Sequence, residues 1–252
     1  MTVSVVIVTY FRPKLVDKLT SQIKKYNPDS EIVVIDQSNK KPNLCAGRNE
    51  GLKKASREIV IYFDDDVEIT KDTINFHIRE YQDPKVVGVA GRVINDGEVV
   101  PKETEVVVGR ANKLLTKFDK NFWSTKRQFV QYPYGCNMSF LKSVLIKAGG
   151  FDEKIPSPAT AFDEIDMALR IEKLGEILFS PKAIVYHHRA LSGGTRENNN
   201  LRKKQYYQSY GRLIRKHVGF PLSVISLIIL KLRIIKEAPE TLFSFLKGYF
   251  FL

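Results

Sequence analysis

Three consecutive carboxylates, Asp64, Asp65 and Asp66, directly follow the apolar run 59–63. A charge-bounded run rich in β-branched and aromatic residues is typical of a strand buried on both faces. The carboxylates then lie at the carboxyl end of that strand, where open α/β sheets bind ligands. Because adjacent carboxylates repel one another, such a cluster favours a compensating cation or several hydrogen-bond donors. The residues alone leave two hypotheses: a divalent metal that carries a phosphorylated ligand, or a solvated acidic turn.

The first 63 residues alternate between strand and helix patterns. The predicted strands are 3–9, 31–35 and 58–63, and the predicted helices between them are 13–26 and 44–56. This order indicates right-handed βαβ units and a parallel sheet. We therefore expect Thr9, Asp36 and Asp64 at the same edge of that sheet.

The α/β pattern continues to residue 197, which predicts one catalytic domain over 1–197. Further helices are predicted at 70–82, 141–148 and 162–174, and further strands at 85–93, 134–140, 177–179 and 183–186. The segment 95–131 shows little regular pattern and is predicted to be an insertion or a lid-like excursion.

The C-terminal residues 198–252 hold most of the chain's positive charge. They carry ten Lys and Arg against two Glu, a surplus of eight out of a net charge of +12. Their apolar stretch 218–230 is shorter than the ~20 residues that cross a bilayer. We predict a basic, amphipathic helical extension that contacts an anionic membrane surface, packs on the catalytic domain or joins a second subunit. No nucleic-acid motif is present, so nucleic-acid binding is not expected.

The two cysteines, Cys45 and Cys136, are too few for a disulfide framework or a cysteine metal site. They are expected to be buried thiols of a reduced, intracellular protein. The first six residues lack the basic region and cleavage site of a signal peptide. The expected location is the cytoplasm, with peripheral contact at the cytoplasmic face of the membrane.

Seven separated motifs follow one another along the chain. They are VSVVIVTY at 3–10, IDQS at 35–38, CAGRNEGL at 45–52, FDDDV at 63–67, GCNMSF at 135–140, GGFDE at 149–153 and DEIDMALR at 163–170. In this order they resemble a family 2 glycosyltransferase of the GT-A-type fold, and the resemblance covers about residues 3–195. It implies a mixed, mostly parallel sheet flanked by helices. It also implies transfer, with inversion, of a sugar from a nucleoside-diphosphate sugar to a hydroxyl of a glycan or lipid-linked acceptor.

The resemblance implies a donor and metal site. Residues that would border the nucleotide and its phosphates are Thr9, Tyr10, Arg12, Asp36, Arg48, Asp64 and Asp65. In this group Asp36 would accept a hydrogen bond from the base, Asp64 would face the ribose, and Asp65 would support the turn. The metal ligands would be Asp66, Asp64 and His187. For His187, a purely structural hydrogen bond is the alternative. Mg²⁺ or Mn²⁺ suits such oxygen-rich sites.

The resemblance also implies a carboxylate general base. In the family a Glu-Asp pair precedes an apolar residue and a second Asp, whereas here the pair is reversed to Asp163-Glu164. Alignment through Asp166 places Glu164 at the base position, with Asp163 as its rival. Residues implied to line the sugar or acceptor region are Gly135, Asn137, Met138 and Asp166. The loop 192–196 would close over the diphosphate or form a mobile surface loop.

Two other functional classes remain open. A nucleotidyltransferase also presents carboxylates at a strand end, but a Gly-rich phosphate loop usually follows its first strand, and residues 10–13 (YFRP) are not one. A non-catalytic nucleotide-binding, membrane-associated scaffold would not need the carboxylates at 163–166. Asp36 favours a uracil-type base and hence a UDP-sugar, although thymine and guanine offer comparable N–H groups. The basic tail favours a lipid-linked or cell-envelope glycan as acceptor.

Overall fold

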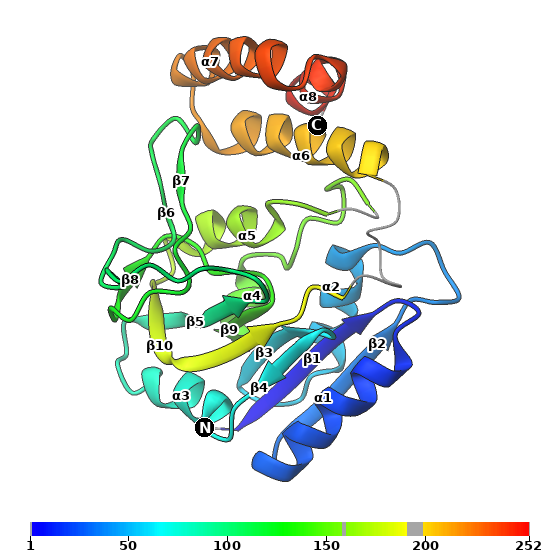
Figure 1. Ribbon diagram of the computed structural model, residues 1–252, viewed down its shortest axis with the longest axis vertical. Helices are drawn as coiled ribbons and strands as arrows, with labels where there is room; N and C mark the ends of the chain where they lie inside the picture. Colours follow the sequence, from blue (N-terminus) through cyan, green and yellow to red (C-terminus); the bar gives the residue numbers. More distant parts are fainter. Residues whose placement is uncertain (1, 158–159, 191–198, 252) are drawn as a thin grey trace.

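The computed structural model describes residues 2–157, 160–190 and 199–251, and it confirms the expected fold class (Figure 1). A mixed sheet of eight strands has the order β2-β1-β3-β9-β5-β10-β4, and β8 pairs with β10. Strands β1, β2, β3, β5 and β10 run in one direction, and β4, β8 and β9 run in the other. Helices cover the sheet, and three more form the C-terminal extension.

The elements have the following bounds. The strands are β1 Val3–Thr9, β2 Glu31–Asp36, β3 Ile59–Asp64, β4 Val67–Ile69, β5 Val86–Asn95, β6 Arg110–Ala111, β7 Phe118–Asp119, β8 Gln128–Val130, β9 Asn137–Leu141 and β10 Glu176–His187. The helices are α1 Pro13–Tyr26, α2 Leu44–Lys54, α3 Thr73–Glu80, α4 Lys142–Lys147, α5 Asp163–Ile171, α6 Asn199–His217, α7 Leu222–Glu237 and α8 Leu242–Phe250, with a 3₁₀ turn at Pro239–Thr241.

Strand β1 lies between β2 and β3, and all three are parallel. The interiors of β1 and β3 are buried because apolar side chains fill both faces of the sheet, whereas β2, at the edge, leaves Val34 exposed. Thr9 pairs in register with Asp36, and Val8 with Asp64. The prediction that these strand ends meet at one edge is therefore confirmed.

Strand β10 is one long strand where the sequence predicted two short ones. Its register against β5 shifts between Ser180 and Ile184, around Pro181, because proline cannot donate to the ladder. Beyond the shift, β10 also pairs antiparallel with the short strand β4, so that His187 lies opposite Val67. The sequence analysis missed β4, which is only three residues long. Its position brings the end of β10 to the acidic turn.

The segment 95–131 is an insertion with structure of its own. It forms the β6–β7 hairpin, and β8 joins the main sheet by pairing with β10. Val108, Leu115 and Phe122 of this segment are buried in the hydrophobic core. Whether it acts as a lid stays a prediction.

The C-terminal helices pack against the catalytic unit. Tyr210 of α6 donates a hydrogen bond of 2.8 Å to the carbonyl of Leu115, and Arg212 pairs with Asp152 at 2.9 Å. Helix α6 also contacts α8 so closely that a Cβ at Gly248 would overlap the Gln208 carbonyl. In Figure 1, α7 and α8 form the layer farthest from the sheet. Within the described residues, no helix combines the length and apolar character needed to cross a membrane.

Candidate active site

The acidic turn joins β3 to β4, and its first carboxylate, Asp64, is the last residue of β3. Asp65 is buried and accepts hydrogen bonds from Thr9 Oγ1 at 2.6 Å and from Arg12 Nη1 at 2.9 Å. Burial raises the pKa of Asp65, and these two bonds oppose that rise. Asp65 therefore ties the turn to the end of β1, as its expected supporting role requires.

Asp66 is held from the opposite side by the end of β10. Its Oδ2 accepts a hydrogen bond of 2.9 Å from the backbone N–H of Ala190, and its own carbonyl accepts one of 2.9 Å from His188. Arg12 Nη1 lies 3.3 Å from the same Oδ2. Asp66 is thus fixed between the first and last strands of the catalytic unit.

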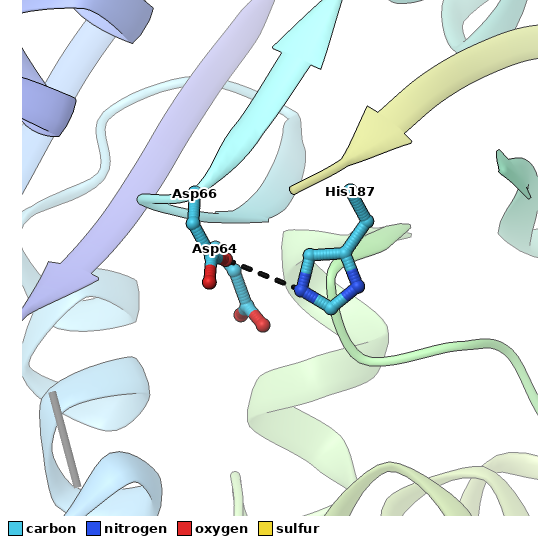
Figure 2. A group of neighbouring side chains, drawn as sticks. All are labelled: Asp64, Asp66 and His187. Atoms are coloured by element: carbon cyan, nitrogen blue, oxygen red, sulfur yellow. Dashed lines mark ion pairs between the residues drawn. The ribbon is translucent and has the colours of Figure 1, made fainter. Parts of the chain in front are cut away.

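Asp64, Asp66 and His187 offer three ligand atoms within 4.8 Å of one another. Figure 2 shows the side chains converging from two elements, with His187 Nε2 lying 3.2 Å from Asp66 Oδ1. His187 and Asp66 are buried, whereas Asp64 is partly exposed. Two carboxylates and one imidazole form a ligand set suited to a divalent cation.

The proton position on His187 supports metal binding. Its Nδ1 lies 3.0 Å from Oδ1 of Asn95, which also accepts from Nε of Arg189. The Asn95 amide nitrogen donates to Glu98 at 2.6 Å, which fixes the amide orientation. Because Asn95 Oδ1 is an acceptor, we assign a proton on Nδ1 to this contact, which makes Nε2 the ring nitrogen that could bind a metal. Nε2 is buried with no hydrogen-bond partner among the described residues, so it is available to a metal.

A cavity of about 530 Å³ opens beside the acidic turn. Its lining includes the predicted donor residues Thr9, Tyr10, Arg12, Asp64, Asp65 and Asp66. Its other walls include Gln37, Pro42 and Ala161, together with Asn199, Arg202, Lys203 and Tyr206 of α6. The sequence analysis did not predict that the extension lines this cavity. The basic residues of 198–217 were visible in the sequence, but their packing partner was not.

Comparison with known proteins decides the family. The glycosyl transferase family 2 model matches residues 17–149, which include the acidic turn. The chain belongs to glycosyl transferase family 2. The family expected from the seven motifs is therefore confirmed.

A curated relative of this glycosyltransferase is the glucosyl-dolichyl phosphate glucuronosyltransferase of Haloferax volcanii. The two are 24% identical over 196 residues, which cover 74% of this chain and 60% of the relative's length. The chain thus spans about three fifths of the relative that it matches.

Solved structures with a similar fold include two proteins in complex with nucleotide sugars. The mannosyltransferase PcManGT of Pyrobaculum calidifontis, in complex with GDP-Man and Mn²⁺, has a TM-score of 0.57 and 15% identity and covers 98% of this chain and 73% of its own. Residues 1–349 of TarS from S. aureus, in complex with UDP-GlcNAc, give a TM-score of 0.61 and 13% identity over 99% of this chain and 90% of theirs. At these identities the likeness establishes the GT-A-type fold.

Asp163 and Glu164 begin helix α5 of the glycosyltransferase but have different surroundings. Asp163 is buried and forms an ion pair with Arg48. Glu164 is partly exposed, and burial, followed by repulsion from Asp163, raises its pKa well above the ordinary carboxyl range. Burial and then the Glu164 charge also raise the pKa of the Tyr132 hydroxyl. Of the two carboxylates, Glu164 is the one not committed to a buried ion pair.

Arg48 was expected to face the nucleotide, but the structure places it in the interior. It is 3% exposed and does not line the cavity. It pairs with Asp163, lies 3.6 Å from Asp64 and donates to the Gly135 carbonyl at 2.8 Å. Arg48 therefore links the end of β3 to the start of α5 through buried contacts, which the sequence motif did not indicate.

The predicted sugar and acceptor residues lie in three different places. Gly135 contributes its carbonyl to Arg48. Asn137 and Met138 are fully buried in β9, where Asn137 bonds to His77 and to backbone carbonyls. Asp166 is buried and pairs with Arg170, Lys216 and His217. Burial acts to raise the pKa of Asp166, but these three partners outweigh burial and hold the pKa well below the usual range. None of the four is among the described residues that line the cavity.

Asp36 lies at the expected edge, next to Gln37 of the cavity wall. Its Oδ1 accepts bonds from the Ser38 hydroxyl and backbone N–H at 2.6 and 2.9 Å, which lower its pKa. The carboxylate is therefore ionised and oriented at neutral pH. The predicted loop 192–196 lies outside the described residues.

Proposed function

We propose that this glycosyltransferase is an inverting, metal-assisted enzyme that uses a nucleoside-diphosphate sugar. The observation that carries the proposal is the group Asp64, Asp66 and His187 beside the 530 Å³ cavity, with the buried Nε2 of His187 3.2 Å from Asp66 Oδ1. Mg²⁺ or Mn²⁺ bound there would offset the charge of the departing diphosphate. Thr9, Tyr10 and Arg12 border the same cavity from the end of β1 and the start of α1.

In the proposed reaction, Glu164 removes the proton from the acceptor hydroxyl. The acceptor oxygen forms a bond to the anomeric carbon as the bond from that carbon to the diphosphate oxygen breaks. A single displacement inverts the configuration and needs no covalent enzyme intermediate. The support for Glu164 is its raised pKa and partial exposure, since a base must keep contact with substrate and titrate near the working pH.

The donor we favour is a UDP-sugar. Asp36, oriented by Ser38 beside the cavity, can accept a hydrogen bond from the imide N–H of uracil. Among the similar folds, TarS is described with UDP-GlcNAc and PcManGT with GDP-Man, so the fold accommodates either type of base. Asp36 is the residue of this chain that favours the uracil-type base.

The acceptor we propose is a hydroxyl of a lipid-linked or cell-envelope glycan, reached from the cytoplasmic side of a membrane. The Haloferax relative is named for a lipid-linked acceptor, glucosyl-dolichyl phosphate. We propose residues 1–197 as the catalytic domain and 198–252 as an extension. Because α6 lines the donor cavity, the extension also contributes to donor binding.

The test is release of free nucleoside diphosphate from a panel of sugar donors, with and without Mn²⁺. The proposal predicts Mn²⁺-dependent release that Asp66→Asn reduces by at least about a hundredfold, because an essential metal ligand is lost. Release of pyrophosphate from a nucleoside triphosphate and a sugar phosphate would instead indicate a nucleotidyltransferase. Donor binding without any turnover on any acceptor would indicate the non-catalytic scaffold.

A further inference from the structure

Helix α7 directs most of its apolar side chains away from the protein. The side chains that it buries are Ser223, Ser226, Leu230 and Ile234. The apolar side chains that it exposes are Leu222, Val224, Ile225, Ile228, Ile229, Leu232 and Ile235. A surface helix of a globular protein usually buries its apolar side and exposes its polar side. In α7 two serines face inward and seven aliphatic residues face outward, so its polarity is the reverse of the usual one.

The exposed residues form one continuous arc with a basic residue at each margin. Successive helical residues are separated by about 100°, which places Ile228 and Leu232 near the middle of the arc. The same spacing places Lys231 at one margin and Arg233 at the other, while Lys236 lies within the arc between Ile225 and Ile229, and all three are exposed. Such an arrangement lets the aliphatic side chains enter an apolar phase while the ammonium groups reach its polar boundary.

Helix α8 and the chain ends around it extend this surface. Phe220, Phe243, Phe250 and Phe251 are between 62% and 87% exposed. Together with the seven aliphatic residues of α7 they form what we call the outer apolar face. Figure 1 shows α7 and α8 as the outermost layer above α6, and α7 also contacts the β6–β7 connection directly through Ser226 and Arg233.

The charge of the extension identifies the chemistry that covers this face. Residues 220–252, which carry the outer apolar face, hold four cations, Lys231, Arg233, Lys236 and Lys247, against Glu237 and Glu240, and Glu240 is paired with Lys203. A second copy of the chain would bring the same excess of cations against itself, which is unfavourable across an interface. An anionic bilayer offers both an apolar phase and negative headgroups. We infer that the outer apolar face docks in the headgroup region of an anionic lipid bilayer.

Docking on this face places the active site next to the bilayer. Helix α6 packs between the outer layer and the donor cavity, and its Arg202 and Tyr206 line that cavity. The donor therefore binds about one helix layer from the membrane surface. This consequence rests on the proposed function and specifies a membrane-held, lipid-linked acceptor; the docking itself does not rest on it.

The test is co-sedimentation of the full chain with vesicles. One set contains phosphatidylcholine alone, and the other contains equal parts of phosphatidylcholine and phosphatidylglycerol. Wild type is expected to sediment with the anionic vesicles and to be released in about 0.5 M salt, where surface charges are strongly screened. The double variant Ile228→Glu/Leu232→Glu is expected to bind at least about tenfold more weakly. Two apolar side chains that would enter the bilayer become charged in this variant.

The matched control is Ile146→Glu, which places the same charge on an exposed aliphatic position of helix α4. It is expected to bind vesicles like wild type. A Lys231→Gln/Lys236→Gln variant is expected to lose preference for the anionic set while keeping its thermal midpoint. Far-UV circular dichroism shows whether each variant is folded.

Two outcomes would overturn the inference. The first is a folded double variant that sediments as well as wild type, or a wild type that binds neither vesicle set. The second is a stable dimer, seen by sedimentation equilibrium without lipid, that the double variant dissociates. Nucleoside diphosphate release measured without vesicles tests the proposed function separately from docking. If a variant loses vesicle binding but still releases nucleoside diphosphate, only the docking has failed. If the protein binds vesicles but releases no nucleoside diphosphate, only the proposed function has failed.

Discussion

At the scale of single residues, Arg48 gives two adjacent carboxylates different chemistry. It forms a buried ion pair with Asp163 in the interior. Glu164 has no such partner among the described contacts, and burial together with the Asp163 charge raises its pKa. Neighbouring residues of one helix thus become a structural anion and a candidate base.

The first prediction separates these two roles by amide substitution. Glu164→Gln is expected to lower the transfer rate by about 10²- to 10⁴-fold, the usual contribution of a general base, and to leave donor affinity unchanged. Asp163→Asn is expected to lower the free energy of unfolding by about 3–5 kcal/mol, because it removes the closer of the two carboxylates that compensate the buried charge of Arg48. Initial rates, donor titration and chemical denaturation of both variants provide the measurements. Full transfer by Glu164→Gln would exclude it as the base.

The second prediction concerns pH. The ionised form of Glu164 is the base, so kcat/KM is expected to rise with pH through a pKa well above the ordinary carboxyl value. Glu164→Gln removes this limb. Because the pKa of Glu164 is higher in the folded state than in the unfolded state, its protonated form favours folding at acid pH. This contribution to stability is lost as pH rises through the folded-state pKa. Glu164→Gln is consequently expected to be at least as stable as wild type at pH 8, as measured by thermal midpoint. A flat wild-type profile between pH 5 and 9 would contradict the assignment.

The third prediction concerns Asn95, which orients His187 and which the sequence analysis did not identify. Asn95→Ala removes the acceptor for Nδ1–H, so Mn²⁺ affinity is expected to fall about 10- to 100-fold. Electron paramagnetic resonance of free Mn²⁺ measures this without substrate. Asn75→Ala, at an exposed position of α3, is the control and is expected to change nothing. Equal Mn²⁺ binding by both variants would show that Asn95 does not support the metal ligand.

At the scale of elements, the sequence predicted what depends on local pattern and missed what depends on distant packing. The strands ending at Thr9, Asp36 and Asp64 follow from apolar runs and from βαβ geometry, and all three are present. Strand β4 was missed because three residues carry no readable period. The burial of Asn137 was missed because its partners come from α3 and from strand backbones far along the chain. Function could be read from motifs, whereas side-chain direction could not.

The fourth prediction tests the packing of α6 on the catalytic unit. Tyr210 is buried and stacks on Phe162, the residue before α5, with ring centroids 4.9 Å apart. Tyr210→Phe keeps the ring but leaves the Leu115 carbonyl without this donor, which is expected to cost about 1–3 kcal/mol of unfolding free energy. Tyr207→Phe, at a partly exposed position of the same helix, is the control and is expected to cost less than about 0.5 kcal/mol. If Tyr210→Phe and Tyr207→Phe have equal free energies of unfolding in urea denaturation, the role given to Tyr210 is contradicted.

At the scale of the whole molecule, the fold places three functions in layers. The sheet edge carries the acidic turn and His187, α6 lines the cavity beside them, and α7 with α8 forms the outer layer (Figure 1). The extension therefore lines the cavity with α6 on one side and exposes the outer apolar face on the other. This arrangement suits an enzyme that draws its donor from solution and its acceptor from a membrane.

The central claim is a single displacement at the anomeric carbon with Glu164 as base. The most direct test is the anomeric configuration of the first-formed product, determined by proton nuclear magnetic resonance with the donor identified in the release panel. The account predicts complete inversion relative to the donor, so that an α-linked nucleotide sugar yields a β-linked product. A product that retains the donor's configuration would contradict it.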